Sequence, residues 1–357
     1  MYKVKIADLE PGMKLAKSTT LADGTVLLSE GVVIKEQYIS RLEDKNIPAV
    51  YVENEEVPNV EQPESVSKGL KDKALTTIKD CLYSIKENEV LSNVKDIKNV
   101  SKNLVDELQQ NRKAVIHLSD IRAYDEYVFG HSVDVAILSI KTAISMGFNQ
   151  LDIQKIAIGA LLHDIGRTKI DKSILTKPGS LTEEEFAKVK THSREGFNIL
   201  KASEEISILS AHIAYQHHEK YNGSGYPRGL KGEEILTGAQ ITAVADIFDA
   251  VTNDRAYRDA VSSLEAVEII REEEEKGNLN PQVVEKFLEN IPVYPVGSIV
   301  KLSNGKTGIV TKVDKDNILT PIIRLIKEEG GKKVDSFREV DLSKRDNLRI
   351  VDSVSSL

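Results

Sequence analysis

The chain is poor in cysteine and in aromatic residues, and it lacks any long apolar run. Of its 357 residues, one is cysteine, none is tryptophan and 5% are aromatic. The single cysteine, Cys81, excludes an intrachain disulfide and a cysteine-based zinc site, and is typical of a reducing compartment. No stretch approaches the roughly 18 consecutive apolar residues of a membrane span, and residues 1–10 lack the apolar core of a signal peptide. We therefore expect a cytoplasmic protein without a membrane span.

Positive charge is also in short supply. The 48 lysines and arginines are outnumbered by 56 aspartates and glutamates, so the net charge is -8. Such a chain offers no broad basic field to a nucleic-acid polymer, and we exclude that class of partner. The length suggests two or three domains, with ample chain to bury a core.

Changes in composition divide the chain into five parts. Glycines separate short apolar runs near the N-terminus, an acidic stretch with two prolines follows, and the middle of the chain has the apolar spacing of helices. Near the C-terminus, Asn304-Gly305 between two apolar runs predicts a β-hairpin. In chain order we expect a small β-rich regulatory module (1–53), a linker (54–67), a connecting helix (68–111), a helix-dominated domain (112–290) and a small β-barrel-like domain (291–357).

An apolar seam runs along the connecting helix. Leu75, Ile78, Leu82 and Ile85 follow one another at spacings of three, four and three residues, which places them on one side of a helix. Such a seam packs either against helices of its own domain or against the same helix of a second copy. We favour the first alternative and keep a homodimer as the second.

The chemistry-bearing residues form one ordered series. Five of the seven histidines fall in it, and all but His192 stand beside a glycine, a carboxylate or another histidine. A single histidine on an apolar face is usually a packed core residue, but a set of imidazoles and carboxylates is what a borderline divalent metal prefers. An adjacent His-Asp pair also lets one carboxylate bridge two ions. The series predicts a metal centre formed by His131, His163, Asp164, His192, His217, His218 and Asp246.

Further motifs accompany these residues in a fixed order. They are His163-Asp164-Ile165-Gly166, Lys177-Pro178-Gly179, His192 to Gly196, His217-His218-Glu219, Gly223-Ser224-Gly225-Tyr226-Pro227, Ala245 to Ala250 and Arg255-Ala256-Tyr257-Arg258. In this order and spacing, over roughly residues 115–290, the chain resembles the HD-GYP family of bacterial cyclic di-GMP phosphodiesterases. The N-terminal and C-terminal parts resemble accessory regions found beside that domain.

The resemblance implies a mainly α fold. An HD-type phosphohydrolase domain, a helical bundle, would be flanked by the small N-terminal β-rich module and the C-terminal β-barrel-like segment. It implies two divalent metal ions, iron or manganese, held by the seven residues of the series with Asp164 as the bridge. The implied reaction is hydrolysis of cyclic di-GMP to linear pGpG, to GMP or to both, by a metal-bridging hydroxide that attacks phosphorus.

The resemblance also implies residues that act on the substrate. Asp164 and Arg167 would be catalytic, and the substrate would be bound by Arg167, Gly225, Tyr226, Arg255 and Arg258. Three positions depart from the family pattern: Arg167 replaces its usual lysine, Gln240 replaces an arginine, and Ala256 replaces a proline. Arginine can still grip a phosphate, but it is a poor proton donor to a leaving oxygen because it barely deprotonates.

Several alternatives stay open at this point. Tyr127 stands where some family members carry a carboxylate for a third metal, with Glu126 one residue earlier, so we expect two ions. Asp249 and Glu219 are left out of the ligand set. Each could hold a ligand histidine or anchor a loop, and for Asp249 we favour the first. The chain could instead be a catalytically weak cyclic-dinucleotide sensor that works through signalling partner proteins. It could also hydrolyse another cyclic dinucleotide.

Overall fold

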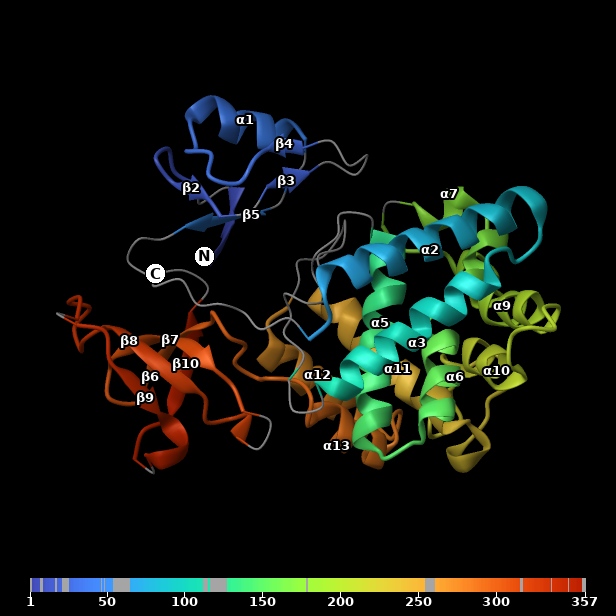
Figure 1. Cartoon of the computed structure of the whole chain (residues 1–357). Coiled ribbons are helices and arrows are strands. Elements are labelled where there is room, and N and C mark those ends of the chain that lie inside the picture. The colour runs from blue at the N-terminus through green and yellow to red at the C-terminus, as the bar shows by residue number, and fades with distance from the viewer. Residues whose placement is uncertain are drawn as a thin grey trace. The chain divides into compact units, whose positions relative to one another are not determined.

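The computed structural model divides into two compact units, which are described one at a time (Figure 1). One unit comprises Glu64–Val293, and the other comprises Met1–Pro63 with Tyr294–Leu357. The structure describes the whole chain except residues 1, 7–8, 17, 21–25, 46, 48, 54–64, 112–114, 116–126, 178, 254–260, 315–316, 335, 346 and 355–357.

The N-terminal part is a small sheet with one helix. Strands β1 (Tyr2–Lys5), β5 (Ala49–Glu53) and β2 (Lys14–Leu15) form an antiparallel sheet in the order β1-β5-β2, and β3 (Thr19–Thr20) pairs with β4 (Val26–Leu28). The N-terminal part has its own hydrophobic core, which includes Leu15, Ile34 and Val52, and helix α1 (Glu36–Asp44) adds the buried side chain of Leu42 to it. The predicted β-rich module is therefore present.

The C-terminal part is a five-stranded antiparallel sheet in the order β10-β6-β7-β8-β9. The hairpin predicted at Asn304-Gly305 joins β6 to β7, and Gly305 has the positive φ of 77° that such a turn favours. The strands are β6 (Ile299–Leu302), β7 (Thr307–Lys312), β8 (Ile322–Lys327), β9 (Glu339–Asp341) and β10 (Ile350–Val354), with a short 3-10 helix η5 (Leu342–Lys344) after β9.

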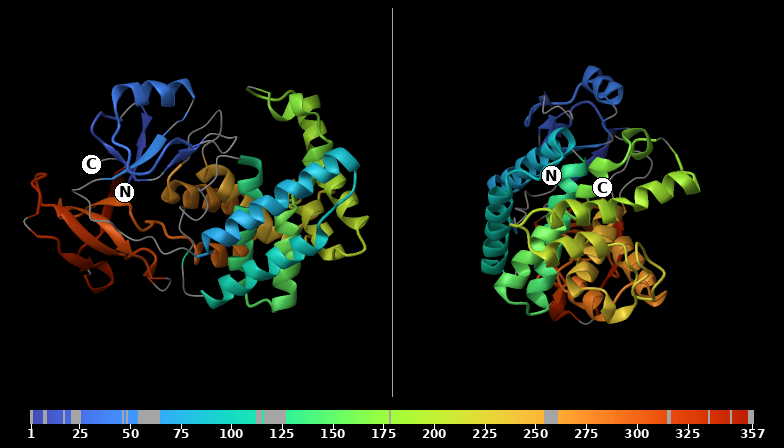
Figure 2. Two further views of the ribbon diagram at one scale, coloured as in Figure 1. Left: turned by 45° about the horizontal axis from the view of Figure 1, so that its top comes forward. Right: turned by 90° about the vertical axis from the view of Figure 1, so that its right-hand side faces the viewer.

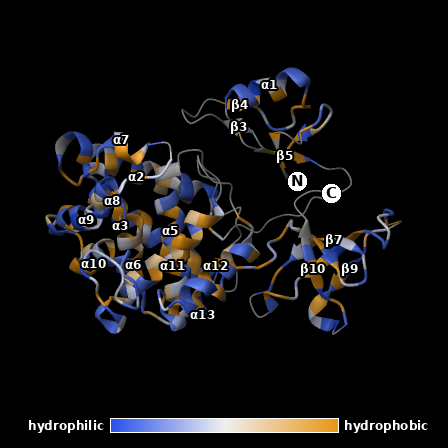
Figure 3. Cartoon of the chain, turned by 180° about the vertical axis from the view of Figure 1, so that it is seen from behind, coloured by the Kyte–Doolittle hydropathy of each residue, from blue (hydrophilic) through white to orange (hydrophobic). Residues whose placement is uncertain are grey.

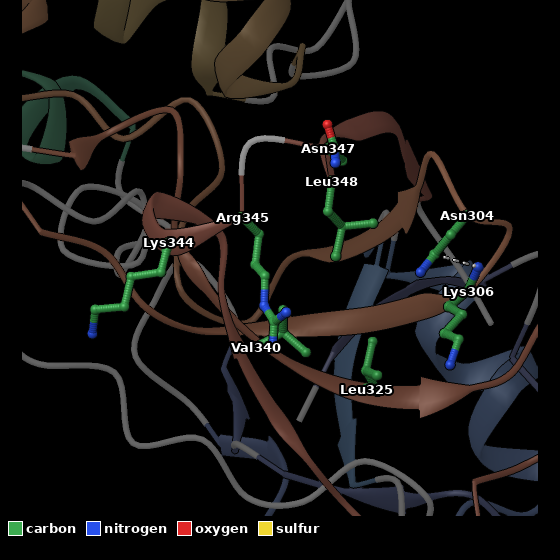
Figure 4. A pocket seen from close by; sticks show the side chains of 8 residues that line it. All are labelled: Asn304, Lys306, Leu325, Val340, Lys344, Arg345, Asn347 and Leu348. Atoms are coloured by element: carbon green, nitrogen blue, oxygen red, sulfur yellow. Dashed lines mark hydrogen bonds between the residues drawn. The ribbon is translucent and has the colours of Figure 1, made fainter.

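A shallow cavity of about 560 Å³ opens on this sheet (Figure 4). Two of its three basic side chains are already neutralised, because Lys306 pairs with Glu328 at 2.7 Å and Lys344 pairs with Asp341 at 2.8 Å. Its lining consists of Asn304, Lys306, Leu325, Val340, Lys344, Arg345, Asn347 and Leu348.

The helical unit surrounds α5 (Tyr127–Ser145), which packs against α6 (Gln150–Leu161) and α11 (Thr237–Thr252). Both α5 and α11 are apolar on most sides, so they are buried over nearly their whole length (Figure 3). Among the described helices, none combines the length and apolar composition that a membrane crossing needs. The other helices are α2 (Lys68–Asn88), α3 (Val94–Gln110), η2 (Ile165–Lys169), α7 (Lys172–Leu175), α8 (Glu183–Lys190), α9 (His192–Lys201), α10 (Ile208–Gln216), η3 (Gly232–Glu234), α12 (Ser263–Glu275) and α13 (Pro281–Leu288).

The predicted connecting helix is in fact two helices, α2 and α3, which lie side by side against α5 (Figure 2). The chain turns between them at Glu89 and Asn93, whose φ angles of 58° and 59° end one helix and precede the next. The seam of α2 is buried within this unit: Ile78 and Ile85 are in its core, where other helices of the same unit cover them. The prediction that the seam packs against helices of its own domain is confirmed. The seam therefore no longer supports a homodimer.

Leu104 tests whether α3 is part of the core. Leu104→Ala should lower the free energy of unfolding by about 2–5 kcal/mol, because the fully buried side chain leaves a cavity. The control Leu151→Ala removes the same side chain from a position on α6 that is 62% exposed, and it should change stability by less than about 0.5 kcal/mol. Urea unfolding followed by helical circular dichroism measures both. Equal effects would contradict the assignment of α3 to the core.

Candidate metal centre

Helix ends deliver most of the predicted ligands to one place. His163 and Asp164 follow the end of α6, His192 is the first residue of α9, and His217 and His218 follow the end of α10. The two longest buried helices supply the others, His131 near the start of α5 and Asp246 within α11. Residues separated by up to 115 positions therefore converge because α5, α6, α10 and α11 pack on one another.

The structure brings all seven predicted ligands together. They form three overlapping groups, and within each group one nitrogen or oxygen atom of every residue lies within 4.8 Å of those of the others. The groups are Asp164, His192, His217 and His218; His131, His163 and Asp164; and His163, His217 and Asp246. Imidazole nitrogen and carboxylate oxygen at this spacing suit a divalent metal site.

Asp164 lies between two pairs of imidazoles. Its Oδ1 is 3.5 Å from His192 Nε2 and 4.0 Å from His217 Nε2. Its Oδ2 is 3.5 Å from His163 Nε2 and 3.8 Å from His131 Nε2. The two oxygens of one buried carboxylate thus face different histidines, which is the arrangement that a bridging ligand needs.

Main-chain carbonyls orient three of the histidines. The Nδ1 atoms of His163, His192 and His217 lie 2.8, 2.7 and 2.8 Å from the carbonyl oxygens of the residues three positions earlier. A carbonyl only accepts, so each Nδ1 must carry the proton and donate it. In the neutral imidazole the Nε2 lone pair is then left for a metal, which is the usual orientation of ligand histidines.

Two of these lone pairs point at each other. His192 Nε2 and His217 Nε2 are 3.3 Å apart. Burial lowers the pKa of both imidazoles, so both are neutral near pH 7 and neither Nε2 has a proton to donate. In addition, His163 Nε2 is buried without a hydrogen-bond partner among the residues that the structure describes. A cation would satisfy all three nitrogens, so the donor set fits a metal.

His131 has a different environment from the other three. Its Nδ1 is 2.6 Å from Asp249 Oδ2, and its Nε2 is 3.2 Å from Asp246 Oδ1. Burial disfavours the charged imidazole, but the hydrogen bonds to Asp246 and Asp249 outweigh it and raise the pKa of His131 to about 10. Without a metal, an imidazolium therefore balances these carboxylates, and a bound cation would replace its Nε2 proton. The prediction that Asp249 holds a ligand histidine agrees with this contact.

Arg167 contacts the carboxylate of Asp164. Its Nε is 2.8 Å from Asp164 Oδ1, and the side chain is 34% exposed. Burial alone would raise the pKa of Asp164, but the charge of Arg167, together with that of the His131 imidazolium, holds it well below its usual range. The guanidinium therefore keeps Asp164 ionised. Arg255 and Arg258, the other predicted arginines, lie outside the described residues, as does Ala256.

The loop that carries Gly225 and Tyr226 closes over the histidines. The Tyr226 ring centre is 4.8 Å from that of His218 and 6.5 Å from that of His192. A Cβ at Gly225 would collide with the backbone of Glu219, so only glycine lets the loop approach this closely. The Glu219 carboxylate accepts hydrogen bonds from the backbone amides of residues 228 and 230, which anchors the loop from below.

Two further positions that stood out in the sequence have structural roles here. The Gln240 amide donates to the carbonyl oxygens of Gly232 and Ile235 and accepts from Asn280, so it ties a loop to the start of α13. Tyr127 is the first residue of α5, and Glu126 lies outside the described residues, so the third-metal position stays a prediction.

Sequence reasoning missed Lys190 and Phe186 on α8. The Lys190 ammonium lies 5.3 Å from the centre of the Tyr226 ring and 4.6 Å from that of Phe186. The sequence did contain a clue to this pair. Phe186 and Lys190 are four residues apart, which puts them on the same side of a helix, and that helix ends just before the predicted ligand His192.

Comparison with known proteins gives two family matches. Residues 101–283 match the HD domain family, and residues 299–356 match the family described as a KOW domain associated with HD domain. The first match contains all seven predicted ligands, and the second contains the five-stranded sheet.

Individual relatives match parts of the chain. A cyclic di-GMP phosphodiesterase of Pseudomonas aeruginosa is 34% identical over 245 residues, which are 68% of this chain and 59% of the relative. A cyclic di-GMP phosphodiesterase of Thermotoga maritima is 45% identical over 161 residues, 44% of this chain and 43% of the relative. A 3'3'-cGAMP-specific phosphodiesterase of Vibrio cholerae is 36% identical over 182 residues, 51% of this chain and 42% of the relative. The chain thus spans about half the length of these relatives.

Asp249 provides a test of how the ligands are held. Asp249→Ala should weaken Mn²⁺ binding by about 10–100-fold, because His131 loses the acceptor that fixes its ring. The affinity is measured by titrating metal-free protein against a chelating dye. The control Asn253→Ala removes a 2.7 Å hydrogen bond to the other Asp249 oxygen without touching His131, and it should have a much smaller effect. Unchanged affinity in Asp249→Ala would contradict this role.

Gly166 provides a test of how tightly α9 is held against the His163-Asp164 turn. A Cβ at Gly166 would collide with the His192 carbonyl oxygen and the Gly196 amide nitrogen. Gly166→Ala should therefore cost about 1–3 kcal/mol of stability. Gly69→Ala, in α2, meets nothing within 4 Å and should stabilise by about 0.5–1 kcal/mol. Urea unfolding measures the two shifts, and shifts of the same sign would refute the close approach.

Proposed function

Because this chain belongs to the HD domain family, as an HD-GYP protein, we propose that its metal centre hydrolyses the phosphodiester bonds of cyclic di-GMP. The products would be linear pGpG, GMP or both. The observation that carries the proposal is Asp164, a buried carboxylate whose two oxygens face different histidines. Two divalent cations sharing such a bridge would activate water and clamp the phosphate, which is the chemistry that phosphodiester hydrolysis needs.

The seven clustered side chains are the proposed ligands, and Asp164 is the proposed bridge. One ion would be held by His192, His217 and His218 with Asp164. The other would be held by His131 and His163 with Asp164 and Asp246, since Asp246 Oδ1 is 3.2 Å from His131 Nε2. Two ions per chain fit this division, and iron or manganese is proposed from the resemblance to the HD-GYP family alone.

Arg167 and Tyr226 are the proposed substrate contacts nearest to the ligands. Arg167 Nε lies 2.8 Å from Asp164 Oδ1, which places the guanidinium beside the proposed bridge, where it would meet a phosphate oxygen. Tyr226, above His218, would cover the substrate, and Gly225 lets it reach that position. Arg255 and Arg258 remain predicted phosphate contacts.

One observation favours a second substrate. The relative from Vibrio cholerae that is 36% identical to this chain is specific for 3'3'-cGAMP. A cyclic dinucleotide with one adenine is therefore the alternative substrate for the same site. A catalytically weak sensor is less well supported, because all the ligands expected for an enzyme are present and clustered.

Turnover by the metal-loaded protein tests the proposal. The full chain is purified without oxygen, its iron and manganese are counted, and cyclic di-GMP is incubated with it and separated by chromatography. About two ions per chain and conversion to pGpG or GMP are expected. His163→Ala should reduce turnover by at least about a hundredfold, because a ligand is lost.

The matched control is His212→Ala. His212 is a histidine on α10 that lies outside the three metal-binding groups, beside Phe197 and Tyr215. Its loss should leave turnover within about twofold of the unaltered chain. Hydrolysis of 3'3'-cGAMP in place of cyclic di-GMP would select the alternative substrate. Two bound metals without hydrolysis of either would select the sensor, and a chain that binds no metal would overturn the proposed centre.

A further inference from the structure

One ammonium group near the metal centre has no carboxylate partner. Lys190, at the end of α8, is partly buried and makes no ion pair within the part of the chain that the structure describes. Two other lysines of this unit are paired: Lys177 is 2.6 Å from Glu185, and Lys169 is 2.8 Å from Glu89. Among the described residues, therefore, no carboxylate pairs with the positive charge of Lys190.

Two aromatic rings hold this ammonium. It lies 4.6 Å from the ring centre of Phe186, one turn earlier on the same helix, and 5.3 Å from that of Tyr226. Both distances are within the range of cation–π attraction. That attraction recovers only part of the hydration that a partly buried ammonium loses, so an anion beside it would still be favoured.

The same Tyr226 ring also contacts the metal centre. Its centre is 4.8 Å from that of His218 and 6.5 Å from that of His192, both proposed ligands. The Lys190 charge is thus one aromatic ring away from the place where a phosphodiester would be hydrolysed. The helix that presents it is fixed at its start by the Thr182 and Glu185 capping box and by the Lys177–Glu185 pair.

We propose that Lys190 binds the phosphate of the cyclic dinucleotide that does not lie at the metals, with Phe186 and Tyr226 holding its ammonium in place. This inference rests on the proposed function. A cyclic dinucleotide has two phosphates, and an enzyme with one metal centre hydrolyses them one at a time, so one phosphate lies away from the metals. The second phosphate carries a full negative charge and needs a cation away from the metal centre. The exposure of Phe186, 46% of its surface, is explained by this role as a support for Lys190.

The test compares two substitutions at Lys190 on two substrates. Lys190→Met keeps the apolar stem and removes the charge, and Lys190→Arg keeps the charge. With cyclic di-GMP, Lys190→Met should raise KM about tenfold or more, while kcat changes little, because a contact made equally in the ground and transition states is lost. Lys190→Arg should restore most of the affinity. Bis(4-nitrophenyl) phosphate has one phosphate, so its hydrolysis should be unaffected by either change.

Lys188→Met is the control, because Lys188 is an exposed lysine on the same helix. It should change none of these values.

Affinity for cyclic di-GMP is also measured by calorimetry on the metal-loaded chain, so that binding is read separately from turnover. If the chain binds but does not hydrolyse cyclic di-GMP, and Lys190→Met weakens binding, the proposed function fails and the role of Lys190 stands. If the unaltered chain neither binds nor hydrolyses it, both fail. Equal KM and affinity in Lys190→Met and the unaltered chain, or an equal loss with bis(4-nitrophenyl) phosphate, would overturn the role of Lys190 alone.

Discussion

The central constraint in the helical unit is that its packing holds unprotonated imidazole nitrogens, which repel one another, close together in the interior. Hydrogen bonds from Nδ1 to main-chain carbonyls force the Nε2 atoms of His163, His192 and His217 toward one centre, and two of them meet at 3.3 Å. Burial suppresses the protons that could relieve this contact. The packed helices therefore hold an arrangement that is unfavourable by itself and becomes favourable when a cation enters it.

The rest of the unit can be understood as the framework that maintains this arrangement. Helices α5 and α11 are buried on nearly all sides, and they fix His131, Asp246 and Asp249 against the helix ends that carry the other ligands. Where backbones approach most closely, at Gly166 and Gly225, a side chain would not fit. Arg167 adds the charge that keeps the central carboxylate ionised. Packing, electrostatics and ligand geometry thus act on the same few residues.

Much of the centre was predictable because metal chemistry leaves a strong signature in residue type and spacing. The histidines, the hairpin at Asn304-Gly305 and the apolar seam of α2 all follow from local patterns. The break between α2 and α3 was missed. Asparagine is often found at the positive φ that Asn93 adopts, but glutamate rarely is, so the end of α2 at Glu89 has no signal in the sequence. The pairing of Arg167 with Asp164 and the two rings around Lys190 depend on how turns and helices meet in space, so spacing could not reveal them.

The way in which the histidines are oriented also bears on how the protein tolerates genetic change. Three of the rings are fixed by the main-chain carbonyl of the residue three positions earlier, and every residue type supplies a carbonyl oxygen. Substitution at positions 160, 189 or 214 therefore leaves the acceptor in place. His131, in contrast to these three, is held by a side chain, that of Asp249, 118 residues away. A substitution of Asp249, a residue of α11 far from His131 in the sequence, can therefore release the ring of His131.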